Sequence, residues 1–278
     1  MRHETGTYQG RDGVGLFRQS WRPDAPARAA VVNLHGLGDH SGLHRHLVEH
    51  LVSRGMAVHA CDLRGHGRSG GQRAYIERWG DYRGDLGALI RIVRRDEAGL
   101  PLFLVGNSLG GLVVLEYALK APDGLAGVVA VAPALGRVGV PRPLMALGRV
   151  FSRVWPRFSL EVGMDLSGLS RDPQAAAEIL ADPLFHRRGT ARLSTEVTAA
   201  IKRVNSGARA LNVPLLLMHG GADRMVPPQG TRRFAARLQG RDHALLEYPG
   251  AYHALFADLD GPRALADLSA WIEARVPS

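Results

Sequence analysis

The sequence predicts an α/β fold in which a mostly parallel central sheet is flanked by helices. Short apolar runs of strand length alternate with segments of helical spacing along most of the chain. These runs are continuously apolar, as is typical of parallel strands buried on both faces. Polar, glycine-rich segments directly follow several of them, and ligands bind at the carboxyl ends of strands in such sheets. We therefore expect one sheet with its functional groups along one edge.

The first part of the chain contains repeated strand–helix pairs. In each pair an apolar run is followed by a segment whose apolar residues recur every three or four positions. The second run ends in Arg-Gly-His-Gly, and the third ends in a glycine–serine turn. Another buried strand is expected at 125–131. The pairs are 31–34 with 41–54, 57–63 with 81–95, and 102–105 with the segment that begins after Ser108.

The alternation of strands and helices is interrupted between residues 134 and 212 and then resumes. This block is too long for a structureless loop in a compact domain. It contains helical patterns and proline-rich joints but no clear buried strand, so we interpret it as a helical cap insertion over the strand ends. Residues 1–133 and 213–278 are then the two parts of the core. The expected elements of the second part are strands 213–218 and 244–248 and helices 229–238 and 262–276.

Composition and charge exclude some classes of function. The 278 residues are 45% hydrophobic and 22% charged, which is ordinary for a globular domain. The formal charge is +9 and is almost entirely arginine, since only Lys120 and Lys202 are lysines. The arginines are spread along the chain, without a basic run interleaved with aromatic residues, so we do not expect a nucleic-acid partner.

The sequence also bears on where the protein resides. Cys61 is the single cysteine, so no intramolecular disulfide can form, and we expect its thiol to pack at the end of a strand. The start of the sequence lacks the apolar core of a secretion signal, and no apolar run approaches the length of a membrane span. We expect a cytoplasmic protein, with a peripheral place at a membrane surface as a further expectation.

A serine stands between the third expected strand and its helix, in the pattern Gly106-x-Ser108-x-Gly110. Small residues around a serine let a strand and a helix meet in a sharp, strained turn that exposes the hydroxyl. The free N–H groups at the start of the helix favour any anion that forms there. Ser108 is therefore a candidate nucleophile for attack on an acyl carbon. A glycine-lined turn with a serine N-cap is the alternative that the motif alone leaves open.

An aspartate and a histidine follow two later strands. Asp223 lies in the loop after the strand at 213–218, and His253 lies in the loop after the strand at 244–248. A serine hydroxyl needs a base to take its proton, and the base needs a carboxylate to orient it. Each residue alone is unremarkable, but the order serine, aspartate, histidine is that of α/β hydrolases. We therefore predict a catalytic triad of Ser108, Asp223 and His253.

Two backbone N–H groups complete the predicted site as an oxyanion hole. One belongs to Leu109, the residue after the nucleophile, and we assign the other to Leu37 in the glycine-flanked loop after the first expected strand. Aligned donors of this kind typically contribute about 10²–10³ in rate. We expect His35 to support this loop without a catalytic role.

The glycine-rich segments at the strand ends also match a known family. They are His35-Gly36-Leu37-Gly38-Asp39-His40-Ser41, Asp62-Leu63-Arg64-Gly65-His66-Gly67-Arg68-Ser69, Gly106-Asn107-Ser108-Leu109-Gly110-Gly111, His219-Gly220-Gly221-Ala222-Asp223 and Tyr248-Pro249-Gly250-Ala251-Tyr252-His253. Over nearly the whole chain, the sequence resembles the monoacylglycerol lipase and lysophospholipase branch of the α/β hydrolases. Asn107 differs from the histidine more usual before the nucleophile. Similar cap segments are Leu169-Ser170-Arg171-Asp172 and Asp182-Pro183-Leu184.

This resemblance implies hydrolysis of a single acyl ester in a tunnel beneath a cap, with no cofactor. We expect a serine esterase that cleaves medium- or long-chain monoacylglycerols to fatty acid and glycerol through an acyl-enzyme. The apolar residues of the insertion favour such a lipid ester over a small polar one. A lysophospholipase, a general carboxylesterase or an acyltransferase on the same triad are alternatives. A hydrolase-like binding protein without turnover is another.

Two short motifs match other kinds of site. His46-x-x-Glu49-His50 fits a zinc-protease pattern, but the leucines around it form the inward stripe of the helix and direct both histidines away. The stretch at 65–70 fits Gly-x-Gly-x-x-Gly, but no apolar helix follows it. We expect neither a metal nor a dinucleotide.

The segment at 144–155 predicts an amphipathic helix in the cap. Leu147, Phe151, Val154 and Trp155 fall on one face, with arginines 149 and 153 opposite. This apolar face could close the acyl tunnel, which is the interpretation we favour from sequence. It could also lie on a membrane or a lipid droplet, with the arginines drawing the enzyme to anionic lipid.

Overall fold

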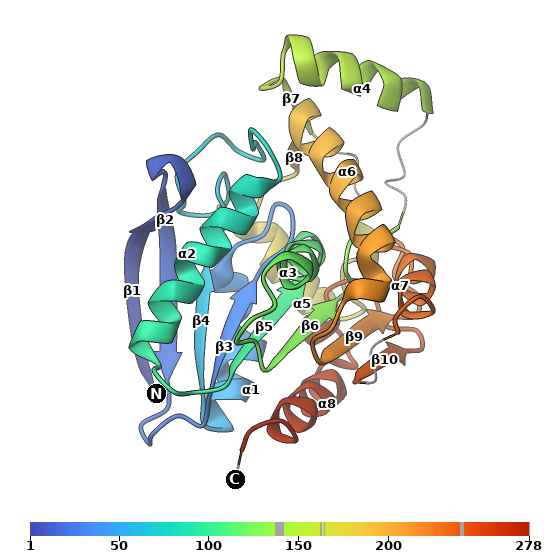
Figure 1. The fold of residues 1–278 in the computed structure, drawn as a ribbon. Coiled ribbons are helices and arrows are strands. Elements are labelled where there is room, and N and C mark those ends of the chain that lie inside the picture. The colour runs from blue at the N-terminus through green and yellow to red at the C-terminus, as the bar shows by residue number, and fades with distance from the viewer. Residues whose placement is uncertain (137–141, 162, 164, 240–241, 278) are drawn as a thin grey trace.

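An eight-stranded sheet forms the centre of the molecule in a computed structural model (Figure 1). The structure describes residues 1–136, 142–161, 163, 165–239 and 242–277. The strand order is β1-β2-β4-β3-β5-β6-β9-β10. All neighbours from β4 to β10 are parallel, whereas β1 and β2 are antiparallel. The strands are β1 (Arg2–Gln9), β2 (Gly15–Arg22), β3 (Ala29–Leu34), β4 (Met56–Cys61), β5 (Leu102–Asn107), β6 (Gly127–Val131), β9 (Leu215–Gly220) and β10 (His243–Tyr248).

Helices cover both faces of the sheet, as expected for continuously apolar strands. Alternate residues of one strand serve different cores: Val31 of β3 packs with residues of α1 and α8, and Val32 packs with residues of α2 and α3. The thiol of Cys61 is buried at the end of β4, as predicted. The α/β class and the mostly parallel sheet are thus confirmed. The helices of the core are α1 (Arg45–Ser53), α2 (Gly80–Asp96), α3 (Leu109–Lys120), α7 (Gln229–Ala235) and α8 (Gly261–Glu273).

The hairpin of β1 and β2 was not expected from the sequence. The two strands pair in register from Arg2 opposite Arg22 to Gln9 opposite Gly15. Most β1 side chains are exposed, and Tyr8 is its one buried residue. An edge strand with one buried side chain carries no continuous apolar run, so hydrophobic periodicity could not detect it.

The chain between β6 and β9 forms helices and strands of its own, of which one helix lies beyond the strand ends and another runs down beside α3 (Figure 1). It includes a short antiparallel pair, β7 and β8, whose three-residue strands are too short to give a sequence signal. Positions 137–141, 162 and 164 of the expected insertion, and the Leu144 side chain, lie outside the described residues. The elements are α4 (Arg142–Val154), β7 (Ser159–Glu161), α5 (Pro173–Ala181), β8 (Arg188–Thr190) and α6 (Ala191–Gly207).

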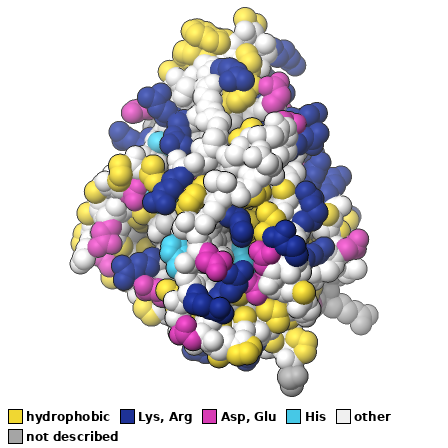
Figure 2. Space-filling view, turned by 90° about the vertical axis from the view of Figure 1, so that its left-hand side faces the viewer, with side chains coloured by type: hydrophobic (Ala, Val, Ile, Leu, Met, Phe, Trp, Pro, Cys, Tyr) yellow, Lys and Arg dark blue, Asp and Glu magenta, His cyan; other side chains and the backbone are white. Residues whose placement is uncertain are grey.

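Helix α4 lies at the end of the molecule opposite α8 (Figure 1). Hydrophobic side chains gather at this end, with basic side chains beside them (Figure 2). Ser152 of α4 and Thr195 of α6 share a 2.8 Å hydrogen bond that ties the two helices together. Within the described residues, no helix is both long and apolar enough to span a membrane.

Polar contacts hold the segment between β6 and β9 to the core at several points. Thr190 Oγ1 donates to the Ala74 carbonyl at 2.7 Å, and the Trp79 N–H donates to Glu196 Oε2 at 2.8 Å. Asn205 Nδ2 donates to the Leu135 carbonyl at 3.2 Å. These contacts link residues far apart in sequence, so they fix where α6 lies against the sheet.

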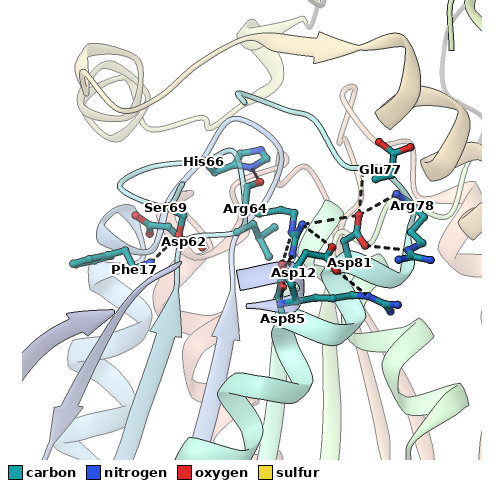
Figure 3. Close-up of polar contacts among 12 residues, drawn as sticks. Asp12, Phe17, Asp62, Arg64, His66, Ser69, Glu77, Arg78, Asp81 and Asp85 are labelled. Atoms are coloured by element: carbon teal, nitrogen blue, oxygen red, sulfur yellow. Dashed lines mark hydrogen bonds and ion pairs between the residues drawn. The ribbon is translucent and has the colours of Figure 1, made fainter. Parts of the chain in front are cut away.

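A buried ion pair holds the loop after β4 against α2 (Figure 3). Arg64 donates from Nε to Asp85 Oδ2 at 2.6 Å and from Nη2 to Asp85 Oδ1 at 2.7 Å. The side chains are 8% and 3% exposed. Asp81, which is also buried, lies 4.0 Å from the guanidinium and accepts the Arg78 N–H. Because charges buried this deeply need a partner, the pair fixes the conformation of this loop.

Replacing Arg64 by methionine should therefore lower the free energy of unfolding by about 3–5 kcal/mol, because the Asp85 carboxylate stays buried without its cation. Arg64→Met combined with Asp85→Leu should recover part of this loss. Urea denaturation followed by circular dichroism measures both. Arg45→Met, which breaks the exposed Arg45–Glu49 pair on α1, is the matched control and should change nothing measurable. A stability equal to wild type in Arg64→Met would contradict the assignment.

Candidate active site

The candidate nucleophile Ser108 lies directly after β5, at the carboxyl edge of the parallel strands. Its backbone has φ 53° and ψ −112°, a region that residues with a side chain rarely adopt. The Ser108 N–H donates to the Val131 carbonyl at the end of β6 at 2.9 Å. The surrounding structure therefore holds the serine in a strained turn, as the sequence motif predicts.

The two glycines of the motif are required by close packing. A Cβ on Gly106 would lie 2.4 Å from the Gly110 carbonyl oxygen, and a Cβ on Gly110 would lie 2.4 Å from the Leu34 carbonyl oxygen. Neither position can hold a larger residue without moving backbone. Helix α3 can thus begin immediately after Ser108 and lie close against β3 and β5.

Asp223 and His253 come together from the loops after β9 and β10. His253 Nδ1 donates to Asp223 Oδ2 at 2.7 Å, and both side chains are buried. The other carboxylate oxygen, Oδ1, accepts the N–H groups of Met225 and Val226, each at 2.9 Å. Both loops leave the same edge of the sheet as Ser108, since β5, β6, β9 and β10 are neighbouring parallel strands.

The surroundings keep the Asp223 carboxyl ionised. Burial by itself would raise its pKa, but hydrogen bonds from His219, His253 and the Val226 N–H outweigh burial, and the pKa falls well below its ordinary value. An ionised Asp223 can therefore orient the His253 imidazole and stabilise a positive charge on it.

The loop after β3 lies directly against Ser108. A Cβ on Gly36 would be 3.2 Å from Ser108 Cβ, and Leu37 is the next residue. In the described part of the chain, none of the backbone–backbone hydrogen bonds that lie outside helices and strands uses the Leu37 N–H as its donor. Leu109 is the first residue of α3, so its N–H has no partner within the helix. Both assigned donors thus come from the segments that flank the serine.

The expected supporting role of His35 is confirmed. His35 Nε2 accepts the Leu63 N–H at 2.8 Å, which leaves Nδ1 to donate to the Gly36 carbonyl at 2.7 Å. Burial lowers the pKa of His35, so the ring stays neutral in this tautomer. It links the loop after β3 to the loop after β4.

Two aspartates that were not singled out in the sequence also hold these loops. Asp39 Oδ1 accepts the His40 N–H at 2.6 Å, and Oδ2 lies 2.9 Å from His44 Nε2. Asp62 Oδ1 accepts the Ser41 N–H, and Oδ2 accepts the Arg68 N–H, both at 2.8 Å. Their place in the motifs at 35–41 and 62–69 was the available signal, but their partners are set only by folding.

Residues of the segment between β6 and β9 hold the loop that carries His253. The His253 N–H donates to the Gly168 carbonyl at 3.1 Å, and the Ala254 N–H donates to the Leu169 carbonyl at 2.7 Å. Arg171 Nε donates to Asp258 Oδ1 at 2.8 Å. The position of the histidine therefore depends on this segment as well as on β10.

The other motifs have structural partners. His50 Nε2 lies 2.9 Å from the buried Ser269 hydroxyl of α8, so this histidine has a structural partner outside the leucine stripe of α1. The stretch at 65–70 forms a turn in which the Gly65 N–H donates to the Gly70 carbonyl at 2.9 Å. Within the described residues, no three His, Cys, Asp or Glu side chains gather so as to hold a metal ion.

Three features together define an α/β hydrolase. They are the strained serine between strand and helix, the buried aspartate–histidine pair at the same sheet edge, and this strand order. The model of the family described as "Serine aminopeptidase, S33" matches residues 25–260. The chain is 32% identical over 268 residues to a monoacylglycerol lipase of Mycolicibacterium smegmatis, which covers 96% of this chain and 95% of that protein. The chain belongs to this hydrolase family, in the branch of the monoacylglycerol lipases.

Other relatives agree with this assignment. The human monoglyceride lipase is 32% identical over 251 residues, which cover 89% of this chain and 82% of that protein. The crystal structure of a Paleococcus ferrophilus monoacylglycerol lipase superimposes with a TM-score of 0.86 at 36% identity, and the match covers 94% of this chain and 99% of that one. The α/β-hydrolase fold expected from the sequence is confirmed.

The lowered pKa of Asp223 predicts a specific acid sensitivity. Because folding lowers this pKa, the ionised carboxylate stabilises the folded chain above about pH 4, and that stabilisation is lost as the pH falls towards the lowered pKa. Asp223→Asn cannot titrate. The difference in unfolding free energy between wild type and Asp223→Asn should therefore shrink by roughly 1 kcal/mol from pH 5 to pH 3. Urea denaturation at each pH measures it, and a difference independent of pH would refute the role of ionisation.

Proposed function

We propose that this protein is a serine hydrolase that cleaves medium- or long-chain monoacylglycerols to free fatty acid and glycerol. The observation that carries the proposal is the 2.7 Å hydrogen bond from His253 to the ionised Asp223. It lies at the sheet edge from which the strained Ser108 also projects. This combination is what a serine hydroxyl needs to attack an ester.

In the proposed mechanism Ser108 Oγ attacks the ester carbonyl while His253 Nε2 takes the hydroxyl proton. Asp223 keeps the His253 Nδ1–H directed towards itself and stabilises the imidazolium. The N–H groups of Leu37 and Leu109 bind the tetrahedral oxyanion. His253 then protonates the departing glycerol, and a water molecule repeats the cycle on the acyl-enzyme.

Relatives and composition support a monoacylglycerol substrate. The Mycolicibacterium, human and Paleococcus proteins carry monoacylglycerol or monoglyceride lipase names at 32%, 32% and 36% identity. We propose that residues 134–212 act as a cap over a core formed by 1–133 and 213–278. The hydrogen bonds from the His253 loop to Gly168 and Leu169 support a cap that adjoins the reacting groups.

Replacing Ser108 by alanine should lower kcat/KM for monoacylglycerol hydrolysis by roughly 10⁴–10⁶-fold. Asp223→Asn should lower it by roughly 10³–10⁴-fold, because the amide no longer selects the required His253 tautomer. Fatty-acid release from monoacylglycerols of 8 to 18 carbons measures both. Both variants should stay folded by circular dichroism.

The same assay separates the alternative activities. Faster cleavage of lysophospholipids, of short-chain esters or of aminoacyl amides would replace the proposed substrate, and transfer of the acyl group to added alcohols would indicate an acyltransferase. If a fluorophosphonate fails to label Ser108 in the folded wild type, the protein is a binding protein and the proposed enzyme is wrong.

We further propose that α4 rests on lipid surfaces while the enzyme works. Large apolar side chains of this helix face solvent: Val150 is 56% and Val154 is 80% exposed, and Trp155 after the helix is 57% exposed. The half-buried Phe151 stacks on Phe158 with ring centroids 5.3 Å apart. The exposure of Val154 and Trp155 argues against the interpretation favoured from sequence, in which the apolar face of this helix closes the acyl tunnel.

The charge around α4 supports an anionic lipid surface as the partner. Arg149 and Arg153 are both exposed, and basic side chains lie beside the apolar end of the molecule in Figure 2. An amphipathic helix with an apolar face and a basic polar face binds such a surface through both forces.

Cytoplasmic residence, expected from the sequence, stays a prediction.

Val150→Asp combined with Val154→Asp should lower co-sedimentation with phosphatidylcholine/phosphatidylglycerol vesicles roughly tenfold or more, because two apolar contacts with lipid are lost. Arg149→Glu combined with Arg153→Glu should weaken binding only to vesicles that contain phosphatidylglycerol. Turnover of a water-soluble ester reports whether each variant is intact.

Leu259→Asp is the matched control, since Leu259 is 63% exposed but precedes α8. It should bind vesicles like wild type. Binding that neither the valine nor the arginine pair alters would exclude α4 as the lipid-contacting surface.

A further inference from the structure

We infer that His219 is a positioning residue for Asp223, and that Thr231 holds the His219 ring in the orientation in which it acts. This inference rests on the proposed serine-hydrolase function. His219 is the penultimate residue of β9 and is fully buried. It is not part of the predicted triad, yet it lies against the same carboxylate as His253.

The ring nitrogens of His219 have different partners. Nε2 lies 2.8 Å from the Val226 carbonyl oxygen and 3.3 Å from Asp223 Oδ2. Both of these oxygens only accept hydrogen bonds, so Nε2 must carry a proton. That proton is directed at the Val226 carbonyl and is shared with the carboxylate.

Thr231 of α7 accounts for the other nitrogen. Its hydroxyl lies 2.9 Å from His219 Nδ1, and it is buried. When the ring is neutral and Nε2 holds its proton, Nδ1 is an acceptor and Thr231 donates. The Val226 carbonyl and the carboxylate set this tautomer, and the Thr231 hydroxyl anchors the opposite side of the ring so that its N–H faces Asp223.

His219 acts on Asp223 by two routes. Directly, its N–H lies near Oδ2, the oxygen that already accepts from His253 at 2.7 Å. Indirectly, it holds the carbonyl of Val226, whose N–H donates to Asp223 Oδ1 at 2.9 Å. One buried ring therefore acts both on the turn that places the Asp223 carboxylate and on the charge of that carboxylate.

As a consequence, the electrostatic attraction between the Asp223 carboxylate and a protonated His253 is weaker. An N–H near Oδ2 withdraws negative charge from the oxygen that faces His253, so the carboxylate stabilises the imidazolium less. Among the charged groups, Glu247 of β10 interacts with His219, and Arg232 Nε of α7 donates to Glu247 Oε2 at 2.8 Å. These two charges largely cancel and remain in all the variants below.

The test is the pH profile of kcat/KM on a water-soluble p-nitrophenyl ester. His219→Leu removes the donor, so the acidic limb should move up by roughly 0.5–1 pH unit. His219→Gln, which can still donate, should restore most of the limb. Thr231→Val should shift the limb in the same direction by a smaller amount, because the ring loses its anchor at Nδ1.

Each outcome bears on one claim. An unchanged limb in His219→Leu, with only reduced stability or kcat, would overturn the inference and leave His219 a packing residue. If that variant does not fold, an unchanged limb in Thr231→Val overturns it instead. The proposed function, rather than this inference, would be contradicted if the wild type had no esterase activity or if activity survived Ser108→Ala.

Discussion

The hydrogen bond between His253 Nδ1 and Asp223 Oδ2 joins the loops that follow β9 and β10. It is short and buried, and it requires Asp223 to remain charged where burial alone would favour a neutral carboxyl. Much of the surrounding structure meets that requirement. Two backbone N–H groups hold Oδ1, and His219 lies beside Oδ2. The chemistry proposed for Ser108 depends on this supported charge.

The same principle of a buried carboxylate with several donors recurs around the sheet edge. Asp62 holds the loop after β3 through Ser41, and Asp258 holds the loop of His253 through Arg171. The pKa of Asp258 is lowered because hydrogen bonds from Arg171 outweigh its burial. Each aspartate joins segments that are distant in sequence, so the loops around the candidate active site are linked to one another by hydrogen bonds. The Arg64–Asp85 pair extends these links to α2.

The segment between β6 and β9 contributes to the site and to the surface at once. Its Gly168 and Leu169 carbonyls receive the N–H groups of the His253 loop, while α4 at its far end exposes apolar side chains to solvent. A protein acting on a lipid ester would need both, because the substrate resides in an apolar phase and the reaction takes place at the sheet edge.

Much of the fold and of the candidate site could be predicted from local patterns. Gly106 and Gly110 indicate the close packing of one strand against one helix, and the apolar runs indicate strands that are buried on both faces. The hairpin of β1 and β2 and the pair β7–β8 could not be predicted, because β1 is largely exposed and β7 and β8 have only three residues each. The exposure of Val150 and Val154 could not be predicted either, since an amphipathic pattern does not say what the apolar face meets.

The sequence by itself determined the order of the parallel strands and of the helices between them, the strained serine turn and the residue types at the strand ends, because these depend on neighbours a few positions apart. Only the tertiary structure decided which carboxylate meets which donor. Asp223 is reached by His253 from another strand, and by His219 through the shape of a single loop. Hydrogen-bond direction and burial depend on contacts between distant segments, and these exist only after the sheet has assembled.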